Sequence, residues 1–447
     1  MRRLVFSLSL WLVAVPAKAQ DTNYWANQYG TRAELLGGIV TGALLDLSAT
    51  YYNPGALAFA NQASLILTTD SFEAQNYAEE DHAPEGLRVT ADRIRPAPSL
   101  FAAQFSAQNS DHKFALSAVT RYNLDLRTTA RGSTPTDPEG GSPFPAASLD
   151  AASEIRLGEG WFGISWAHPF GEHVGVGATT YFAYRSHFGR GELSRQDIQA
   201  PDQGSSLRIV DEFQYSHSRL FWKLGLAIDL DPLVVGLSLT SPSIGLYGRG
   251  ERLINNGLTI TNPGGATNEL VASYQRDLES TYRSAPAVSV GTSYSFKNTS
   301  LYGTVEWFAG IEQYAVIDGQ DFTGQTTGEP ETVDLRHALS SVFNWGFGLE
   351  HRFGGRWTGY AAFSTDRSSF SEDSDPGLVF SSWDLYHVTS GAAITVGQID
   401  LTFGASYGWG QDEFPSNIPI IEPERVTELK YRRLKILFGF MLAFGDA

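Results

Sequence analysis

Several long segments of this sequence alternate between large apolar residues and small or polar ones. From Leu434 to Phe444 every even position is a large apolar residue, and from Ile399 to Trp409 the odd positions are apolar. The same pattern runs from Leu220 to Leu230 at even positions and, with two interruptions, from Leu339 to Phe353 at odd positions. Because successive side chains of a strand point to opposite faces, each segment predicts a β-strand with one apolar face.

Strands of ten residues or more are longer than the usual five or six, and they match the length that a tilted strand needs to cross a bilayer. Two architectures use such strands. A soluble sandwich buries its apolar faces against each other, whereas a membrane barrel turns them toward lipid. Trp166, Trp222, Trp345 and Trp357 fall near strand ends, as the interfacial girdle of a barrel requires, although large rings also favour strands in general.

The lengths of the connections favour the barrel. Short turns are expected at residues 108–113, 168–173, 230–233, 297–299, 353–356 and 397–399. Long polar loops are expected near residues 77–85, 127–148, 189–211, 248–273, 318–334, 371–381 and 411–426. Because the two kinds interleave strictly, they predict an all-β, transmembrane antiparallel β-barrel of about 14 strands over residues 62–447, with short periplasmic turns and long outer loops. An even strand count leaves both chain ends in the periplasm.

Composition excludes several classes of protein. The chain has 447 residues and no cysteine, so it has no disulfide scaffold and no thiolate chemistry. It carries 32 Lys and Arg against 49 Asp and Glu, a net charge of -17. This balance argues against a nucleic-acid partner, because no basic stripe is available to contact phosphates. An aromatic content of 13% argues against a disordered chain.

The first nineteen residues predict a secretory signal peptide, residues 1–19. A basic start at Met1–Arg3 precedes the apolar stretch Leu4–Val15, and Ala17-Lys18-Ala19 has the small-x-small pattern of a cleavage site. The apolar stretch ends at Pro16, short of the roughly 20 residues that a spanning helix needs. Together with the missing cysteine and the abundant glycine and aromatic residues, this leader predicts an outer-membrane protein of a Gram-negative cell.

Residues 20–61 are the only part of the chain that does not alternate. Thr31 and Glu34 have the spacing of a capping box, followed by an expected helical stretch of leucines and small residues over 35–45. Asn53 as a cap and Pro54 as a first helical residue predict a second short helix over 54–59. These residues are too numerous for a tail and too apolar to extend into water. We therefore expect them inside the barrel as a plug, or hatch.

Three short stretches resemble one known family. Gly30–Glu34, Gly37–Gly38 and above all Tyr51–Leu57 are similar to the N-terminal hatch of the FadL/TodX family of outer-membrane transporters. The resemblance implies a fourteen-stranded barrel plugged by a hatch that carries an Asn-Pro-Ala motif. Asn53, Pro54 and Gly55 stand at the motif here, with glycine where the family usually has alanine.

The resemblance also implies a function, the passive transport of hydrophobic small molecules such as long-chain fatty acids or aromatic hydrocarbons. In the family, substrate binds at an outer groove, passes to an internal site near the hatch and leaves sideways through a gap in the wall. The resemblance therefore assigns gating to Asn53, Pro54 and Gly55, and it identifies no ligand-contacting residue. We expect a monomer whose partners are the hydrophobic substrate and the lipid and lipopolysaccharide of the outer membrane, with no cofactor or metal.

A second hypothesis is a related barrel that does not transport but docks or shuttles secreted surface proteins. A plain porin would lack the plug. An enzyme is not favoured: Gly404–Gly408 matches the G-x-S-x-G motif of hydrolases, but that motif requires a strand-to-helix turn and here lies in an alternating strand. The acidic clusters Glu79–Glu85 and Glu372–Asp375 are better explained as solvated loops than as calcium sites.

Overall fold

The alternating segments form one closed antiparallel sheet. The computed structural model describes residues 22–60, 63–80, 88–90, 97–106, 110–134, 147–200, 203–375, 382–416 and 425–444. The predicted signal peptide, residues 1–19, and both chain ends lie outside the described residues. Within the described residues, no helix is both long enough and apolar enough to cross a bilayer.

The elements are, in chain order, α1 (Thr31–Leu35), α2 (Ala49–Tyr52), the 3-10 helix η1 (Pro54–Phe59), β1 (Ala63–Glu80), β2 (Arg88–Thr90), β3 (Ala97–Ser106), β4 (Lys113–Thr134), β5 (Ala147–Phe170), β6 (Val174–Ala200), β7 (Gln203–Asp229), β8 (Leu233–Thr240), β9 (Ile244–Asn262), β10 (Gly265–Ser280), β11 (Ala287–Phe296), β12 (Thr299–Phe308), β13 (Ile311–Asp318), β14 (Phe322–Thr323), β15 (Pro330–Glu331), β16 (Leu335–Leu339), β17 (Val342–Gly354), β18 (Trp357–Asp366), β19 (Leu385–Val396), β20 (Ile399–Ser416) and β21 (Arg425–Phe444).

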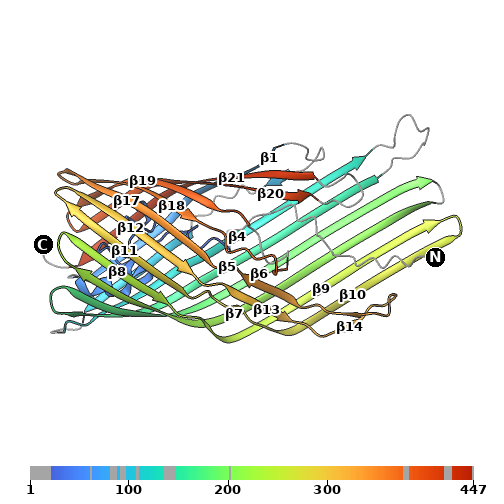
Figure 1. The fold of residues 1–447 in the computed structure, drawn as a ribbon, viewed down its shortest axis with the longest axis horizontal. Coiled ribbons are helices and arrows are strands. Elements are labelled where there is room, and N and C mark those ends of the chain that lie inside the picture. Colours follow the sequence, from blue (N-terminus) through green and yellow to red (C-terminus); the bar gives the residue numbers. More distant parts are fainter. Residues whose placement is uncertain are drawn as a thin grey trace.

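The main sheet contains 19 strands, and they make fourteen passes of the barrel wall. Four passes consist of two strands in line (β8 with β9, β10 with β11, β12 with β13, and β16 with β17), and β2 extends the pass that contains β3. Pairing of β21 with β1, from Ala63 opposite Phe444 onward, closes the barrel. The predicted fourteen-stranded barrel is therefore confirmed (Figure 1).

The two faces of the wall divide as the alternation predicts. Phe347, Phe403 and Phe438 point outward and are 56%, 42% and 46% exposed, whereas the residues between them point inward. The predicted outward orientation of Leu339 is wrong, because this residue is buried. The alternation is interrupted at residues 340–341, between β16 and β17. The belt of outward rings and aliphatic chains is the surface that a barrel presents to lipid.

The short turns lie where the sequence predicts them, at residues 171–173, 230–232, 297–298, 355–356 and 397–398, with a sixth between Ser106 and Lys113 that is described in part. Two predicted long loops, 189–211 and 248–273, are wrong. They continue as the paired strands β6 with β7 and β9 with β10, which extend past the neighbouring wall (Figure 1). Paired strands that extend beyond the lipid do not need an apolar face. Their cross-strand pairs are polar, such as Arg190 with Glu212 at 2.8 Å.

Replacing a lipid-facing ring by a charge tests the placement of the belt. Phe347→Arg puts a guanidinium in the apolar band and should lower the free energy of unfolding by about 2–4 kcal/mol. Ile260→Arg is the matched control, because Ile260 is also exposed (40%) but lies in the extension formed by β9. Its cost should be below about 1 kcal/mol. Denaturant unfolding in lipid vesicles, followed by tryptophan fluorescence, measures both; equal costs would contradict the placement.

Candidate functional site

The described N-terminal residues, 22–60, run through the inside of the barrel, and we call them the luminal segment. Buried apolar residues of its first half pack against β11, β12, β17, β18, β19 and β21. Those of its second half pack against β1 and β3–β7. Contacts with strands on opposite sides of the wall place the segment across the lumen.

The segment begins near the end of β18 where the long loop starts. Asn23 forms an isolated bridge with Ser368 and its side-chain amide donates to the carbonyl of Asp366 at 2.8 Å. The amide of Trp25 donates to the Asp366 carboxylate (2.9 Å), and its indole N–H donates to Glu306 (2.6 Å). Since Ala60 precedes β1 at the short-turn end, the segment traverses the lumen from one level of the barrel to the other.

Glycines of the wall form depressions for the first half of the segment. Leu35 lies so close to Gly404 and Gly391 that an added Cβ would be 2.5 and 2.6 Å from its side chain. A Cβ at Gly346 would similarly lie 2.8 Å from Ile39. These contacts are closer than van der Waals contact, so the inward glycines of β17, β19 and β20 are required for the segment to pack against the wall.

The predicted capping box is wrong. Gly30 occupies the cap, and the hydroxyl of Thr31 donates to Asp46 (3.0 Å) instead of capping its own helix. The predicted helical stretch over 35–45 is also wrong, because α1 ends at Leu35 and Gly37 and Gly38 follow with φ values of +61° and +77°. Glycine in this left-handed conformation ends helices, and the chain here follows the wall instead of continuing a helix.

Asn53 sits between α2 and η1 and makes the cap that the sequence predicts. Its side-chain oxygen accepts from the amide of Gly55 at 3.1 Å, and Pro54 opens η1. Its side-chain NH₂ donates to the carbonyl of Thr41 (2.8 Å) within the segment and to that of Leu226 (3.0 Å) on β7. Asn53 is 1% exposed. This one side chain therefore joins two parts of the luminal segment to the wall.

The motif Asn53-Pro54-Gly55 lies directly on wall glycines. A Cβ at Gly225 would be 2.3 Å from the Asn53 side-chain oxygen, and one at Gly177 would be 2.3 Å from the Pro54 carbonyl. Gly177 and Gly225 are register partners on β6 and β7. A Cβ on Gly55 would itself lie 2.8 Å from the backbone of β6 and β7. This close backbone approach leaves no room for a side chain at position 55 without a shift of the backbone.

A buried charge cluster lies on the inward face beyond the motif. Glu159 on β5 accepts from Arg185 at 2.9 Å and from Arg219 at 2.5 Å, and the indole of Trp161 donates to it at 2.6 Å. Arg185 and Arg219 are each 1% exposed at the side chain. Among the described residues, Nη1 of Arg219 and Nδ1 of His217 are buried and have no hydrogen-bond partner.

Aromatic clusters lie on both sides of this charge cluster. Toward the extended strands, Phe213 and Tyr215 pack with Tyr282, Tyr314 and other apolar residues. Toward the motif, Trp161 stacks on Tyr51 of the luminal segment (5.8 Å between ring centroids) and meets Phe221 edge-on (4.7 Å). The lumen therefore contains two apolar regions separated by a narrow polar row.

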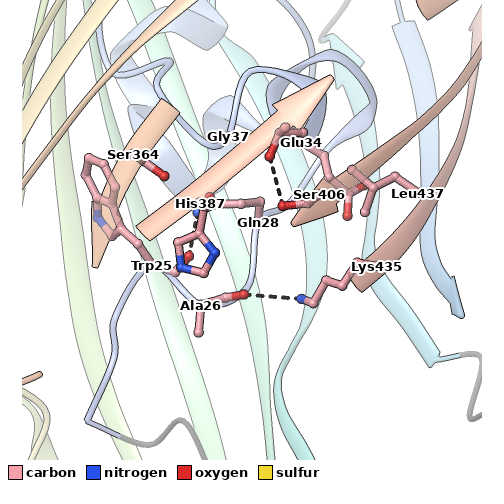
Figure 2. Close-up of a pocket in the computed structure, with 11 residues that line it drawn as sticks. Trp25, Ala26, Gln28, Glu34, Gly37, Ser364, His387, Ser406, Lys435 and Leu437 are labelled. Carbon is pink, nitrogen blue, oxygen red and sulfur yellow. Dashed lines mark hydrogen bonds between the residues drawn. The ribbon is translucent and has the colours of Figure 1, made fainter. Parts of the chain in front are cut away.

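A small cavity lies between the luminal segment and β18–β21. Its lining includes Trp25, Gln28 and Glu34 from the luminal segment and His387, Ser406 and Lys435 from the wall (Figure 2). The ammonium of Lys435 donates to the carbonyl of Ala26 at 3.2 Å across it. Its volume of 20 Å³ accommodates about one water molecule. In this closed arrangement the cavity is too small for a hydrocarbon.

In the described residues, the other motifs noted in the sequence do not form a catalytic or metal site. Gly404–Gly408 lies within β20, without the sharp turn of a hydrolase nucleophile, and Ser406 accepts from Thr389 at 2.9 Å. The side chains of Glu79–Glu85 lie outside the described part. Within that part, no group of three or more histidine and acidic side chains has the arrangement of a metal site.

Comparison with known proteins identifies the fold. Neither a scan against protein-family models nor a search of curated proteins returns a match. A FadL homologue from Pseudomonas aeruginosa superimposes with a TM-score of 0.57 at 12% identity, over 95% of this chain and 100% of its own.

Two toluene transporters match similarly. TodX of Pseudomonas putida gives a TM-score of 0.56 at 12% identity, over 94% of this chain and 98% of its own. TbuX of Ralstonia pickettii gives 0.54 at 13% identity, over 94% and 99%. The chain has the fold of the FadL and TodX barrels, which confirms at the level of the fold the family that the hatch motif predicts.

Adding one methyl group to a wall glycine tests the fit of the motif. Gly225→Ala should displace Asn53 and destabilise the protein by about 1–3 kcal/mol, the usual cost of overpacking. Gly303→Ala is the control, because its nearest neighbour would be 3.9 Å away. Hydrogen exchange of residues 53–59 should accelerate only in the first variant. Unchanged exchange in Gly225→Ala would contradict the close fit.

Proposed function

We propose that the protein is an outer-membrane channel for the passive uptake of hydrophobic small molecules, such as long-chain fatty acids or aromatic hydrocarbons, and that the luminal segment is its hatch. The observation that carries the proposal is a lipid-facing barrel whose lumen is filled by a segment fitted against wall glycines. The related fold of FadL and of toluene transporters supports the same class of cargo.

The division of the chain follows from this proposal. Residues 1–19 are the signal peptide, 20–61 the hatch and 62–447 the barrel. The long-loop end faces outward and the short-turn end faces the periplasm, as in other barrels of this kind. β1 begins and β21 ends at the short-turn end, which supports a periplasmic C-terminus. Thr22 contacts Ser368 and Ser369 beyond β18, so the first described residue of the hatch lies near the long-loop end.

The lumen offers an apolar molecule a route in two stages. The outer aromatic cluster around Phe213 and Tyr314 would receive it first, and the cluster around Trp161 and Tyr51 would follow. Between them, the guanidinium of Arg219 has a buried N–H without a partner among the described residues. It would donate to a polar end of the cargo, since buried donors without partners are costly. The second stage ends against the hatch.

Opening requires the hatch to leave its position on the wall near Asn53. The three hydrogen bonds of Asn53 join Thr41, η1 and β7. The other bonds of this part to the wall are also between uncharged groups: Thr179 and Tyr181 donate to the Thr50 carbonyl at 3.0 and 2.9 Å. By contrast, the start of the segment is held by Asp366 and by the ion pair between Arg32 and Asp400 (2.6 Å). We therefore assign gating to Asn53, Pro54 and Gly55, with the anchored start remaining in place.

The extended strands favour a second candidate function. β6, β7, β9 and β10 extend beyond the neighbouring wall and expose much of their surface (Figure 1). A barrel that docks or shuttles secreted surface proteins would use such an extension. Uptake measurements separate the candidates, because a docking barrel would leave the uptake of apolar compounds unchanged when it is absent.

Asn53→Ala tests the gating role. The variant leaves two buried carbonyls without their donor, a loss of about 1–3 kcal/mol for the closed position of the hatch. Because this loss favours the displaced hatch, the initial uptake rate should rise by about tenfold. Asn255→Ala, on β9 away from the hatch, is the control and should transport normally. The uptake of radiolabelled toluene and oleate by cells that carry each variant as the only copy gives the rates. A difference in electrophoretic mobility between unheated and heated samples confirms that the barrels are folded.

The outcomes separate the two parts of the proposal. A normal rate in Asn53→Ala would remove the gating role and leave transport in place. A rate that is the same with and without the wild-type protein would remove transport itself, and would favour docking.

A further inference from the structure

The outward face of β17–β20 carries a continuous aromatic surface. Neighbouring ring centroids lie 5.8 Å apart between Trp345 and Phe363, and 6.4 Å apart between Phe363 and Tyr386. Tyr386 stacks on Trp409 at 5.9 Å and Trp409 on Tyr407 at 5.8 Å. Tyr386 and Tyr407 are 40% and 42% exposed. We call these five rings the aromatic surface.

An exposed arginine borders the aromatic surface on each side. Arg367 directly follows β18, and Arg432 lies on β21 opposite Trp409. In the order of the strands the face therefore presents Arg367, Tyr386, Trp409 and Arg432. Both arginines are exposed, and neither guanidinium has an ion-pair or hydrogen-bond partner among the described residues. The described residues therefore leave both guanidiniums free to bind an anion.

Other charged side chains lie on the same face as these arginines. Asp384 lies on the same face, and its carboxylate accepts from the amide of Ser368 at 3.1 Å. Lys430 lies two residues before Arg432, so it points to the same face. The two guanidiniums face one described carboxylate, that of Asp384, although the whole chain has a net charge of -17.

Both arginines lie at the outer edge of the lipid-facing belt. Arg367 is ten residues beyond Trp357, where β18 begins, and Arg432 is twelve residues from Phe444, where β21 ends. Ten strand residues tilted by about 45° rise roughly 23 Å, close to the height of the apolar band of an outer-membrane barrel. The arginines are therefore at the level of lipid head groups, together with Tyr386 and Trp409, which are in register with Arg432. Phe363 and Tyr407 lie two residues closer to the middle of the belt and face acyl chains.

We infer that this face binds a phosphorylated glycolipid of the outer leaflet, with Arg367 and Arg432 each taking one phosphate. Arginine binds phosphate through paired, charge-assisted hydrogen bonds. The strands that carry the two arginines are three spacings apart, roughly 14 Å. This separation suits two phosphates at opposite ends of a disaccharide, whose sugar rings lie over Tyr386 and Trp409. It does not suit the single phosphate of a glycerophospholipid.

The inference rests on the proposed membrane placement and is independent of the cargo. It is tested by native mass spectrometry of the purified full chain in non-ionic detergent, titrated with bisphosphorylated lipid A, dephosphorylated lipid A, phosphatidylglycerol and inorganic phosphate. The test variant is Arg367→Gln with Arg432→Gln, and each single variant is included. The control is Arg276→Gln with Arg356→Gln, two exposed arginines away from the aromatic surface.

The wild type and the control should bind bisphosphorylated lipid A at least about tenfold more tightly than the other probes. The double variant should lose about that factor, and each single variant part of it. Equal binding by the double variant and the wild type would overturn the inference. Dephosphorylated lipid A binding the wild type as tightly as bisphosphorylated lipid A would overturn it too. Phosphatidylglycerol binding as tightly as bisphosphorylated lipid A would show a general surface for anionic lipids, and would also overturn the inference.

Uptake measurements keep this result separate from the proposed function. The double variant should take up toluene and oleate at the wild-type rate, because neither arginine faces the lumen. Lost lipid A binding with normal uptake supports the inference, and intact lipid A binding overturns it whatever the uptake rate.

Discussion

Backbone hydrogen bonding in lipid determines this architecture. Within a bilayer no water is present to satisfy an unpaired peptide group, so strands can cross only as a closed sheet. The pairing of β21 with β1 completes that closure. Closure then creates a second requirement, because the interior widens with the number of strands. Eight strands can be filled by their own side chains, whereas fourteen enclose a lumen that needs an additional occupant. The luminal segment is that occupant.

The glycines of the wall follow from this second requirement. A chain segment can lie flat against the inside of a sheet only where the sheet carries no side chains. Gly177 and Gly225 provide that space for Pro54 and Asn53, and Gly391 and Gly404 provide it for Leu35. The same alternation that exposes Phe403 to lipid places Gly404 toward the lumen. One sequence pattern thus builds both the membrane surface and the binding surface for the hatch.

The sequence predicts those features that depend on a single strand or a few adjacent residues. The outward positions of Phe347 and Phe403, the short turns and the cap by Asn53 all have local causes. Features that depend on pairing between strands are not predicted. Glu159 meets Arg185 and Arg219 only because β5, β6 and β7 pair in one register, and inward charges such as these read in sequence as ordinary polar positions.

Two errors have the same origin. Residues 189–211 and 248–273 look like loops because they are polar, yet cross-strand hydrogen bonds hold them as strands in water. Likewise, the Thr31–Glu34 spacing is typical of a helix start, but Asp46, distant in sequence, takes the hydroxyl of Thr31. In both cases a tertiary partner replaced the local interaction that the pattern suggested.

A hatch fitted against glycines differs from one held by many polar bonds. Close contacts at Gly177 and Gly225 involve the neighbouring residues Pro54 and Asn53, so they are lost together when this part of the backbone moves away. Packed interfaces of this kind have discrete arrangements and do not deform continuously. The proposed displacement of Asn53 would also have to break the hydrogen bonds that Thr179 and Tyr181 donate to the Thr50 carbonyl. The residues bonded to Asp366 would hold the start of the segment in the barrel during such a movement.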